Sequence, residues 1–153
     1  GRLKPVLQSI RSLKRAGVWL EVTTLIIPGL NDDSGELREM AGFIASLGRE
    51  TPWHLSAFHP SYRMTDRPPT PVQTLRQAAE IGIEAGLRYV YLGNVPQSEF
   101  RHTLCHQCGS KLIDRSSLVA EPVNLDHGHC SHCGQDLPGI GMKLSRDQSL
   151  GFG

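Results

Sequence analysis

Apolar residues recur along the first part of the chain in two alternating patterns, one typical of helices and the other of strands. Val6, Ile10 and Leu13 are spaced by four and three residues, which places them on one face of a helix. Gly17 ends that pattern, because glycine is a common helix stop. The stretch 18–27 is rich in β-branched residues and nearly continuous in apolarity, which predicts a strand buried on both faces.

The same order of helix and strand continues along the chain. Asp33 predicts the start of a helix that Gly48 ends, since aspartate is a preferred N-cap residue. Three further elements are expected: a strand at 53–58, a helix that begins at Thr70-Pro71, and a strand at 88–92. Strands that alternate with helices at this spacing favour parallel β/α units, so the expected fold class is α/β.

The number of expected strands is too small for a closed structure. Three strands cannot close a barrel, and one edge of the sheet would be open and apolar. A helical pattern also starts almost at the first residue. We therefore expect the chain to be a fragment of a longer protein, with further strands encoded upstream of Gly1. Residues 1–95 would then be the C-terminal part of a partial (β/α) barrel.

The composition changes after residue 95, and all four cysteines fall within 29 residues. They form two Cys-x-x-Cys-Gly motifs that are separated by 21 residues, namely Cys105, Cys108, Cys130 and Cys133. Four thiolates at this spacing are the ligand set of a tetrahedral structural zinc. We therefore expect 96–139 to be a zinc-ribbon module whose closed metal site is not catalytic. Residues 140–153 are polar and rich in glycine, which predicts a flexible tail.

Alternatives for the cysteines are left open. Iron can occupy the same four-thiolate cage. Two disulfides would need an oxidising compartment, and the sequence has no signal-peptide pattern to support one. A thioredoxin-like redox pair would occur once, at a strand-to-helix junction. Five histidines crowd the same segment, and we interpret them as solvated or as neighbours of the ligands, because four cysteines complete the coordination: His102, His106, His127, His129 and His132.

Ligands of parallel β/α proteins gather at the carboxyl ends of the strands, where the chain offers several polar residues. His59 follows the second strand and is a candidate hydrogen-bond donor to a cofactor or a proton carrier, unless it caps its own loop. Thr23 and its neighbour Thr24 must face opposite sides of their strand, and packing is the simpler role for both. Asn94 is a candidate ligand contact or a turn residue. We assign no role to His54.

Composition and charge exclude several classes of partner. The 153 residues include 16 Lys and Arg against 15 Asp and Glu, a formal net charge of +1, which gives no electrostatic attraction for a phosphate backbone. No apolar run reaches the roughly 18 residues of a membrane span. We therefore expect a cytoplasmic protein without nucleic-acid or membrane partners. The sequence holds no Gly-rich phosphate loop, no nucleophile elbow and no complete active site.

Four sequence segments, taken in their order along the chain, resemble one protein family. They are Glu21-Val-Thr-Thr-Leu-Ile-Ile-Pro-Gly-Leu-Asn-Asp-Asp33, Trp53-His-Leu-Ser-Ala-Phe-His-Pro60, Tyr89-Val-Tyr-Leu-Gly-Asn-Val-Pro96 and the double Cys-x-x-Cys-Gly ribbon. In this order they resemble the C-terminal half of the AmmeMemoRadiSam system radical SAM enzymes, relatives of the pyruvate formate-lyase activating enzymes. The resemblance covers about residues 3–140.

The resemblance implies a partial (β/α) barrel that holds a 4Fe-4S cluster and S-adenosylmethionine, whose reductive cleavage yields methionine and a 5′-deoxyadenosyl radical. It implies that His59 lies near the cofactor pocket, because it matches the histidine that ends a late barrel strand in the family. The activating enzymes have an arginine where this chain has Thr23. The C-x3-C-x2-C cluster motif of the family is absent, so we expect this chain to be inactive alone.

We therefore expect the C-terminal portion of a radical SAM enzyme. Thr23, His59 and Asn94 would contribute to the wall of the cofactor and substrate pocket, and the ribbon would be free to recognise a protein substrate or partner. Two alternatives belong to other classes. One is a zinc-ribbon protein-binding module on a β/α scaffold without catalysis, and the other is a different β/α-barrel enzyme, such as an aldolase or hydrolase, with a structural zinc.

Overall fold

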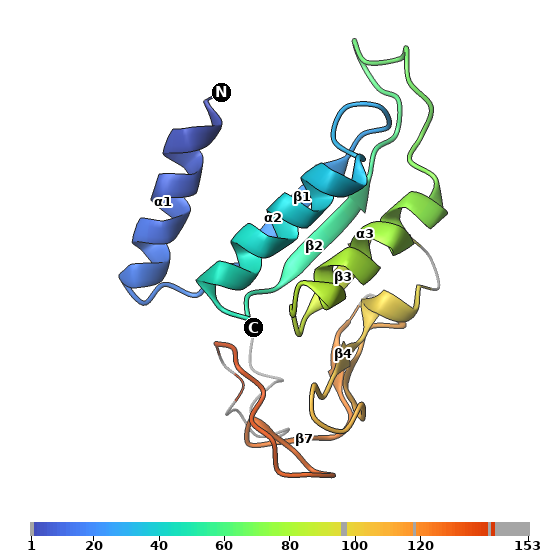
Figure 1. Ribbon diagram of the computed structural model, residues 1–153. Coiled ribbons are helices and arrows are strands. Elements are labelled where there is room, and N and C mark those ends of the chain that lie inside the picture. The colour runs from blue at the N-terminus through green and yellow to red at the C-terminus, as the bar shows by residue number, and fades with distance from the viewer. Residues whose placement is uncertain (1, 96–97, 118, 141, 143–153) are drawn as a thin grey trace, which may run out of the picture. The chain divides into compact units, whose positions relative to one another are not determined.

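A computed structural model describes residues 2–95, 98–117, 119–140 and 142 (Figure 1). The contacts divide the chain into two compact units, Gly1–Ser98 and Glu99–Gly153. The first unit, which we call the β/α unit, has a parallel sheet, and the second, the ribbon unit, has small antiparallel sheets. The expected α/β class is therefore confirmed. Most of the expected tail, 140–153, lies outside the described residues.

Helices and strands alternate along the β/α unit. They are α1 (Leu3–Arg15), β1 (Val22–Ile26), α2 (Ser34–Leu47), β2 (Trp53–Ala57), α3 (Val72–Glu84) and β3 (Val90–Gly93). The three strands pair in parallel in the order β1-β2-β3, with Val22 opposite Trp53 and Trp53 opposite Val90. Their carboxyl ends therefore lie at one edge of the sheet, as parallel β/α units require.

The core of the β/α unit lies between the sheet and two helices. Helix α3 packs on β2 and β3 and contacts α2 (Figure 1). Trp53 and Leu55 are fully buried on the face of β2 that meets these helices. Thr24 lies on the same face of the sheet, and its hydroxyl accepts a hydrogen bond from the Trp53 indole at 2.9 Å. One polar side chain thus satisfies the only donor of a buried tryptophan.

The opposite face of the sheet is left partly open. We call it the open face, and its residues are half-buried or exposed: Thr23, Leu25, His54, Ser56, Tyr91 and Gly93. The prediction of one strand at 18–27, buried on both faces, is therefore wrong. Strand β1 is shorter, and Leu25 keeps 45% of its surface exposed because the helices of this unit cover one face of the sheet.

The helix starts are partly as expected. Asp33 caps α2, and its carboxylate accepts hydrogen bonds from the amides of Gly35 and Glu36 at 2.8 and 3.2 Å. The helix start expected at Thr70-Pro71 is confirmed, since Pro71 is the N-cap residue of α3, although no side chain caps this helix. Instead of capping the helix, the hydroxyl of Thr70 bonds to backbone groups of Ile26 and Phe58, at the ends of β1 and β2.

Helix α1 forms at the expected place but buries none of its residues. Lys14 attaches its last turn to the unit through an ion pair with Glu50 at 2.9 Å. Arg11 adds a cation–π contact with the Phe43 ring at 4.9 Å. The apolar side of the helix stays largely uncovered, and Val6 and Leu13 keep 52% and 46% of their surface exposed.

The ribbon unit consists of short elements. They are the 3-10 turn η1 (Glu99–Arg101) and the strands β4 (Thr103–Leu104), β5 (Lys111–Asp114), β6 (Glu121–Pro122), β7 (Leu125–Asp126) and β8 (His129–Cys130). Strands β4, β5 and β6 form one antiparallel sheet, and β7 and β8 form a hairpin. His127 and Gly128 join the hairpin with positive φ angles of 46° and 85°, which two-residue hairpin turns favour. Strands β5, β6 and β7 all lie between the two Cys-x-x-Cys-Gly motifs in sequence.

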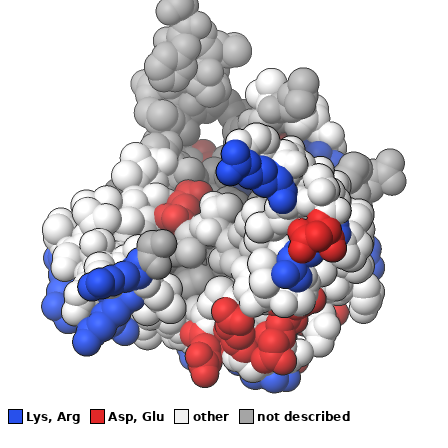
Figure 2. Space-filling model, turned by 90° about the horizontal axis from the view of Figure 1, so that it is seen from above, with Lys and Arg blue, Asp and Glu red and all other residues white. Residues whose placement is uncertain are grey.

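The described part of the surface carries charged side chains of both signs. Among the described residues, no helix is long and apolar enough to cross a membrane. Figure 2 shows acidic and basic side chains on one face, where some groups of opposite sign lie next to each other and uncharged surface separates others. A formal net charge of +1 is consistent with this mixture.

Candidate functional site

The four cysteines lie on two turns with the same backbone geometry. The amide of Cys105 donates to Ser110 O, and the amide of Cys130 donates to Gln135 O, each at 2.8 Å. Each turn also closes through a bond from the glycine after its second cysteine, Gly109 or Gly134, to the carbonyl of the first. Those glycines have φ angles of 74° and 75°, which a β-carbon would disfavour. Two short motifs thus present their sulfurs alike.

The sulfurs converge on a common centre. The Sγ atoms of Cys105 and Cys133 are 3.6 Å apart, those of Cys108 and Cys130 are 3.7 Å apart, and all four lie within 4.8 Å of one another. A tetrahedron with metal–sulfur bonds of about 2.3 Å has edges of about 3.8 Å. The cluster therefore matches the ligand set of a tetrahedral ion such as zinc, and it can hold one. The four thiols are free, so the alternative of paired disulfides has no support here.

Two of the four thiols differ in pKa. Ser110 Oγ lies 3.3 Å from Cys108 Sγ, and this hydrogen bond lowers the pKa of Cys108 to about 6. The amide of Gln135 acts to lower the pKa of Cys133, but desolvation and the neighbouring sulfurs outweigh it and raise that pKa to about 12. Four crowded thiols therefore cannot all ionise unless a cation balances their charge, which a divalent metal does.

The histidines of the ribbon unit do not join this cluster. Among the described residues, the group whose ligand atoms come together is formed by the four cysteines alone. His129 instead pairs with Asp136 at 2.6 Å, with both side chains more than half exposed. His102 accepts a hydrogen bond from the Arg115 amide through Nδ1 at 3.2 Å. Cys105 and Cys130 are buried, with 2% and 1% of their surface exposed, whereas Cys108 and Cys133 are exposed.

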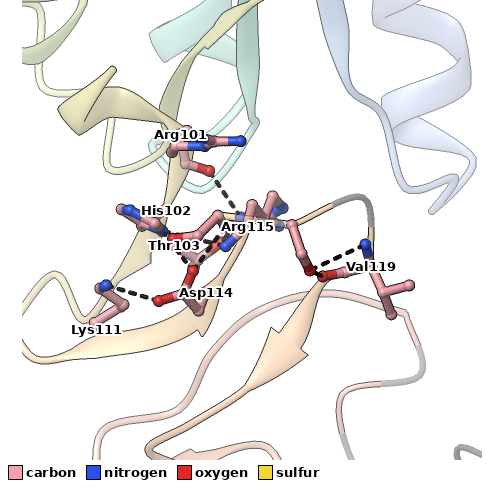
Figure 3. A network of polar contacts seen from close by, with 9 residues as sticks. Arg101, His102, Thr103, Lys111, Asp114, Arg115 and Val119 are labelled. Atoms are coloured by element: carbon pink, nitrogen blue, oxygen red, sulfur yellow. Dashed lines mark hydrogen bonds and ion pairs between the residues drawn. The ribbon is translucent and has the colours of Figure 1, made fainter. Parts of the chain in front are cut away.

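A polar network joins β5 and the residue that follows it to η1 and β4 (Figure 3). Asp114 accepts from Lys111 Nζ at 2.8 Å and from the amide of Ser116 at 2.7 Å, and these bonds hold the pKa of Asp114 well below its usual range. Arg115 donates to the buried hydroxyl of Thr103 at 2.6 Å and to the carbonyl of Arg101 at 3.4 Å. The network ties η1 and β4 to β5, so it positions the turn that carries Cys105.

Polar side chains also extend the ends of the parallel strands. Asn94, at a positive φ of 47°, accepts from the amide of Ala57 at 2.8 Å and donates to its carbonyl at 2.9 Å. Asn31 likewise accepts from the Ile27 amide and donates to the Leu25 carbonyl. The side-chain amides of Asn94 and Asn31 thus make the hydrogen bonds that a neighbouring strand would make if the strand pairing continued. The expected site residue Asn94 therefore holds β2 and β3 together, in agreement with its expected alternative as a turn residue.

Thr70 joins two strand ends from a long loop. Its buried hydroxyl donates to Ile26 O at 2.6 Å and accepts from the Phe58 amide at 2.8 Å. Arg67, from the same loop, donates to the carbonyl of Pro28 at 3.1 Å. His59 lies exposed at the start of this loop, directly after Phe58. Side-chain hydrogen bonds thus tie the carboxyl edge together, and His59 follows this edge with an exposed side chain.

The structure separates the remaining candidates by face. Thr23 is exposed on the open face, and Thr24 bonds to Trp53 on the covered one. Sequence reasoning left His54 without a role. In the structure its Nε2 lies 2.8 Å from a carboxylate oxygen of Glu21, which is 33 residues away in sequence. No periodic signal could have found this pair, because it depends on strand pairing.

Comparison with known proteins gives one relative. The chain is 46% identical over 138 residues to the uncharacterized protein MJ0808 of Methanocaldococcus jannaschii, a match that covers 88% of the chain and 41% of that protein. The chain therefore spans about two fifths of the length of the curated relative it matches. No family model matches the chain. No solved structure matches it either.

Proposed function

We propose that this chain is the C-terminal portion of a cytoplasmic radical SAM enzyme of the AmmeMemoRadiSam type, followed by a zinc ribbon. The observation that carries the proposal is the parallel sheet β1-β2-β3, which has helices on one face and polar side chains on the other. In a (β/α) barrel the helices lie outside and the opposite face lines the interior. The open face would then be part of the inner wall of a partial barrel.

The greater length of the similar protein supports this proposal. The chain matches 41% of MJ0808, so more than half of that protein is available for further β/α units. Such units would pair with a free edge of the sheet and cover the apolar side of α1, where Val6 and Leu13 are exposed. The segments from Glu21 to Asp33, Trp53 to Pro60 and Tyr89 to Pro96 supply the resemblance to the enzyme family.

The cofactors of that family fit this chain only in part. All four cysteines belong to the ribbon, so the ligands of a 4Fe-4S cluster must come from the remainder of the longer protein. When bound there, the cluster and S-adenosylmethionine would supply a 5′-deoxyadenosyl radical. From this chain, His59 would donate a hydrogen bond at the carboxyl edge of the sheet. Thr23 would offer its hydroxyl from the open face, and Asn94 would hold the edge in place.

The ribbon would hold zinc through its four thiolates and act as a structural element. A closed four-sulfur site leaves no open position for a substrate or a water molecule. The short strands around it would give the enzyme a surface for a protein substrate or partner. This part of the proposal does not depend on radical chemistry.

The proposal is tested on the full-length polypeptide under anaerobic conditions, with its cluster reconstituted and a low-potential reductant added. We expect S-adenosylmethionine to be converted to methionine and 5′-deoxyadenosine. His59→Ala should lower the yield of 5′-deoxyadenosine, because the variant loses an edge-of-sheet donor, whereas the exposed ribbon residue His132 can be changed to alanine without effect. Absence of 5′-deoxyadenosine from a protein that holds its cluster would refute the proposal.

A zinc-ribbon binding module is the second candidate. The observation in its favour is that Glu99–Gly153 forms a compact unit of its own. Such a module would bind a protein partner equally well with and without S-adenosylmethionine, and Cys130→Ser would abolish this binding. A full-length protein that binds its partner in this way but never cleaves S-adenosylmethionine would favour the module.

A further inference from the structure

The open face carries a row of chemically active side chains. The strand register places Thr23 of β1 opposite His54 of β2, and His54 opposite Tyr91 of β3. The next row on this face is Leu25, Ser56 and Gly93. Gly93 has no side chain, and a β-carbon there would lie 3.1 Å from Ser56 Oγ. The row beside it therefore offers the small groups of Ser56 and Gly93 next to the exposed side chain of Leu25.

His54 is held from two sides. Its Nε2 lies 2.8 Å from Glu21 Oε2, and its ring stacks on Tyr91 with 5.1 Å between the ring centroids and 27° between the planes. The second oxygen of Glu21 accepts a hydrogen bond from the Trp19 indole at 3.1 Å. The carboxylate is thus oriented by one ring and in turn orients another. The side chains of His54 and Glu21 remain 33% and 50% exposed.

The contact with Glu21 assigns the proton of the neutral imidazole. A carboxylate only accepts hydrogen bonds, so Nε2 carries the hydrogen and Nδ1 keeps its lone pair. Within the part of the chain that the structure describes, His54 Nδ1 has no hydrogen-bond partner. A carboxylate that orients a histidine in this way stabilises the imidazolium that forms when the free nitrogen takes a proton.

We propose that Glu21 and His54 form a proton-transfer dyad for a substrate bound over the open face. Nδ1 of His54 takes the proton from an O–H or N–H group of a polar substrate, the substrate keeps the bonding electron pair, and Glu21 balances the charge of the imidazolium. Tyr91 fixes the plane of the imidazole. The inference deepens the proposed function and rests on it, because the open face would line the interior of the barrel.

Stability alone does not explain the arrangement. A half-exposed carboxylate–imidazole pair contributes about 0–1 kcal/mol to folding. Among the described residues, one ring nitrogen of His54 also has no hydrogen-bond partner, and the side chain is 33% exposed. Strand residues rise by about 3.3 Å each, so the row lies roughly 10 Å from the carboxyl edge, a distance that a small polar molecule spans.

The dyad is tested by diethyl pyrocarbonate, which acylates the unprotonated nitrogen of accessible imidazoles, on the full-length protein with peptide mapping of each histidine. We expect His54 to react together with the exposed His127 and ahead of His102, whose Nδ1 already accepts an amide bond. Glu21→Gln should lower the rate constant of unprotonated His54 about threefold, because the ring loses the carboxylate that fixes its tautomer and orientation. Glu36→Gln on α2 is the matched control and should leave it unchanged.

Two results would overturn the dyad. His54 that stays unmodified while His127 reacts would mean that packed side chains fill the open face. A rate constant that Glu21→Gln leaves unchanged would mean that the carboxylate does not activate the ring. The cleavage of S-adenosylmethionine is measured separately, so a reactive, Glu21-dependent His54 in a protein that never forms 5′-deoxyadenosine would refute the radical SAM proposal and not the dyad.

Discussion

The β/α unit encloses a continuous apolar core between its sheet and its helices, whereas the ribbon unit buries few apolar side chains around a cluster of sulfurs. Trp53, Leu55 and Leu75 are fully buried in the first unit. Among the described residues of the ribbon unit, the buried hydrophobic side chains are those of Leu112, Leu137, Cys105 and Cys130. Domains of about 40 residues usually need a metal or disulfides, because their cores are too small. The two units therefore depend on different interactions for their folded state.

The two units also differ in what each needs besides its own residues. The ribbon unit brings its four ligands together within itself. The β/α unit leaves a helix face and a sheet face open, with Leu13 and Leu25 both more than two fifths exposed. We therefore expect the stability of the ribbon unit to depend on bound metal and the stability of the β/α unit to depend on further polypeptide. Both tryptophans, Trp19 and Trp53, lie in the β/α unit, so their fluorescence follows its unfolding alone.

The largest expected effect is the loss of the metal site. Cys130→Ser removes a buried ligand, and the metal-binding free energy that supports such a unit is on the order of 10 kcal/mol. We expect bound zinc to be lost and the amides of the ribbon unit to exchange freely, while the strands of the β/α unit stay protected in hydrogen-exchange measurements. His132→Ala, an exposed change between the same two cysteines, should keep the zinc. A ribbon unit that stays protected without metal would contradict this expectation.

The second effect concerns the strand ends. Thr70→Val removes the hydroxyl that joins Ile26 O to the Phe58 amide and leaves both backbone groups unpaired. We expect the free energy of unfolding of the β/α unit to fall by about 2–3 kcal/mol, measured by urea titration with tryptophan fluorescence. Thr65→Val, in the exposed part of the same loop, should change it by less than about 0.5 kcal/mol. Equal effects would mean that the buried hydroxyl is unimportant.

Alanine substitution of two helical glycines should change the stability of the β/α unit in opposite directions. A β-carbon at Gly82 would lie 3.0 Å from the Trp53 ring and 3.1 Å from Val90, whereas one at Gly42 meets nothing within 4 Å. Gly82→Ala should therefore destabilise the β/α unit by about 1–3 kcal/mol through overpacking. Gly42→Ala should stabilise it by about 0.5–1 kcal/mol, because alanine favours the helix. The same urea titration measures both, and stabilisation by both would show that α3 does not pack tightly on β2.

The smallest effect is electrostatic. The hydrogen bond from Lys14 holds the pKa of Glu50 below its ordinary value of 4.5, so the pair stabilises the folded state above that pH and loses its contribution as the pH falls through the lower folded-state pKa. At about pH 7, Glu50→Gln should lower the free energy of unfolding by about 0.5 kcal/mol. At about pH 3.5 the difference from the unaltered chain should be smaller. A difference that grows on acidification would contradict the expected sign.

Local patterns predicted the features that depend on neighbours in sequence. Asp33 caps its helix, and the spacing of Cys105 and Cys108 predicted a metal-binding turn because one turn presents both sulfurs. Features that depend on distant partners were missed. Thr70 bonds to a carbonyl 44 residues away, and Glu21 reaches His54 across a strand pairing. Periodicity contains no information on such contacts, since they arise only when the sheet assembles.

The exposure of the first strand shows the same limit. An apolar run predicted burial on both faces, and apolarity alone cannot state which face a neighbouring element covers. The role of Asn94 was likewise undecided from sequence, because its bonds to Ala57 require β2 and β3 to lie side by side. The expected contacts of His59 and Thr23 with a cofactor stay predictions.

Metal analysis of this chain and of the full-length polypeptide, both purified anaerobically, tests the central claim most directly. We expect this chain to hold zinc in an amount equal to the protein and no iron, because its cysteines form the ribbon site alone. We expect the full-length polypeptide to hold the same zinc and, in addition, the iron and sulfide of a 4Fe-4S cluster after reconstitution. A full-length polypeptide that holds zinc but never takes up iron and sulfide would contradict the account.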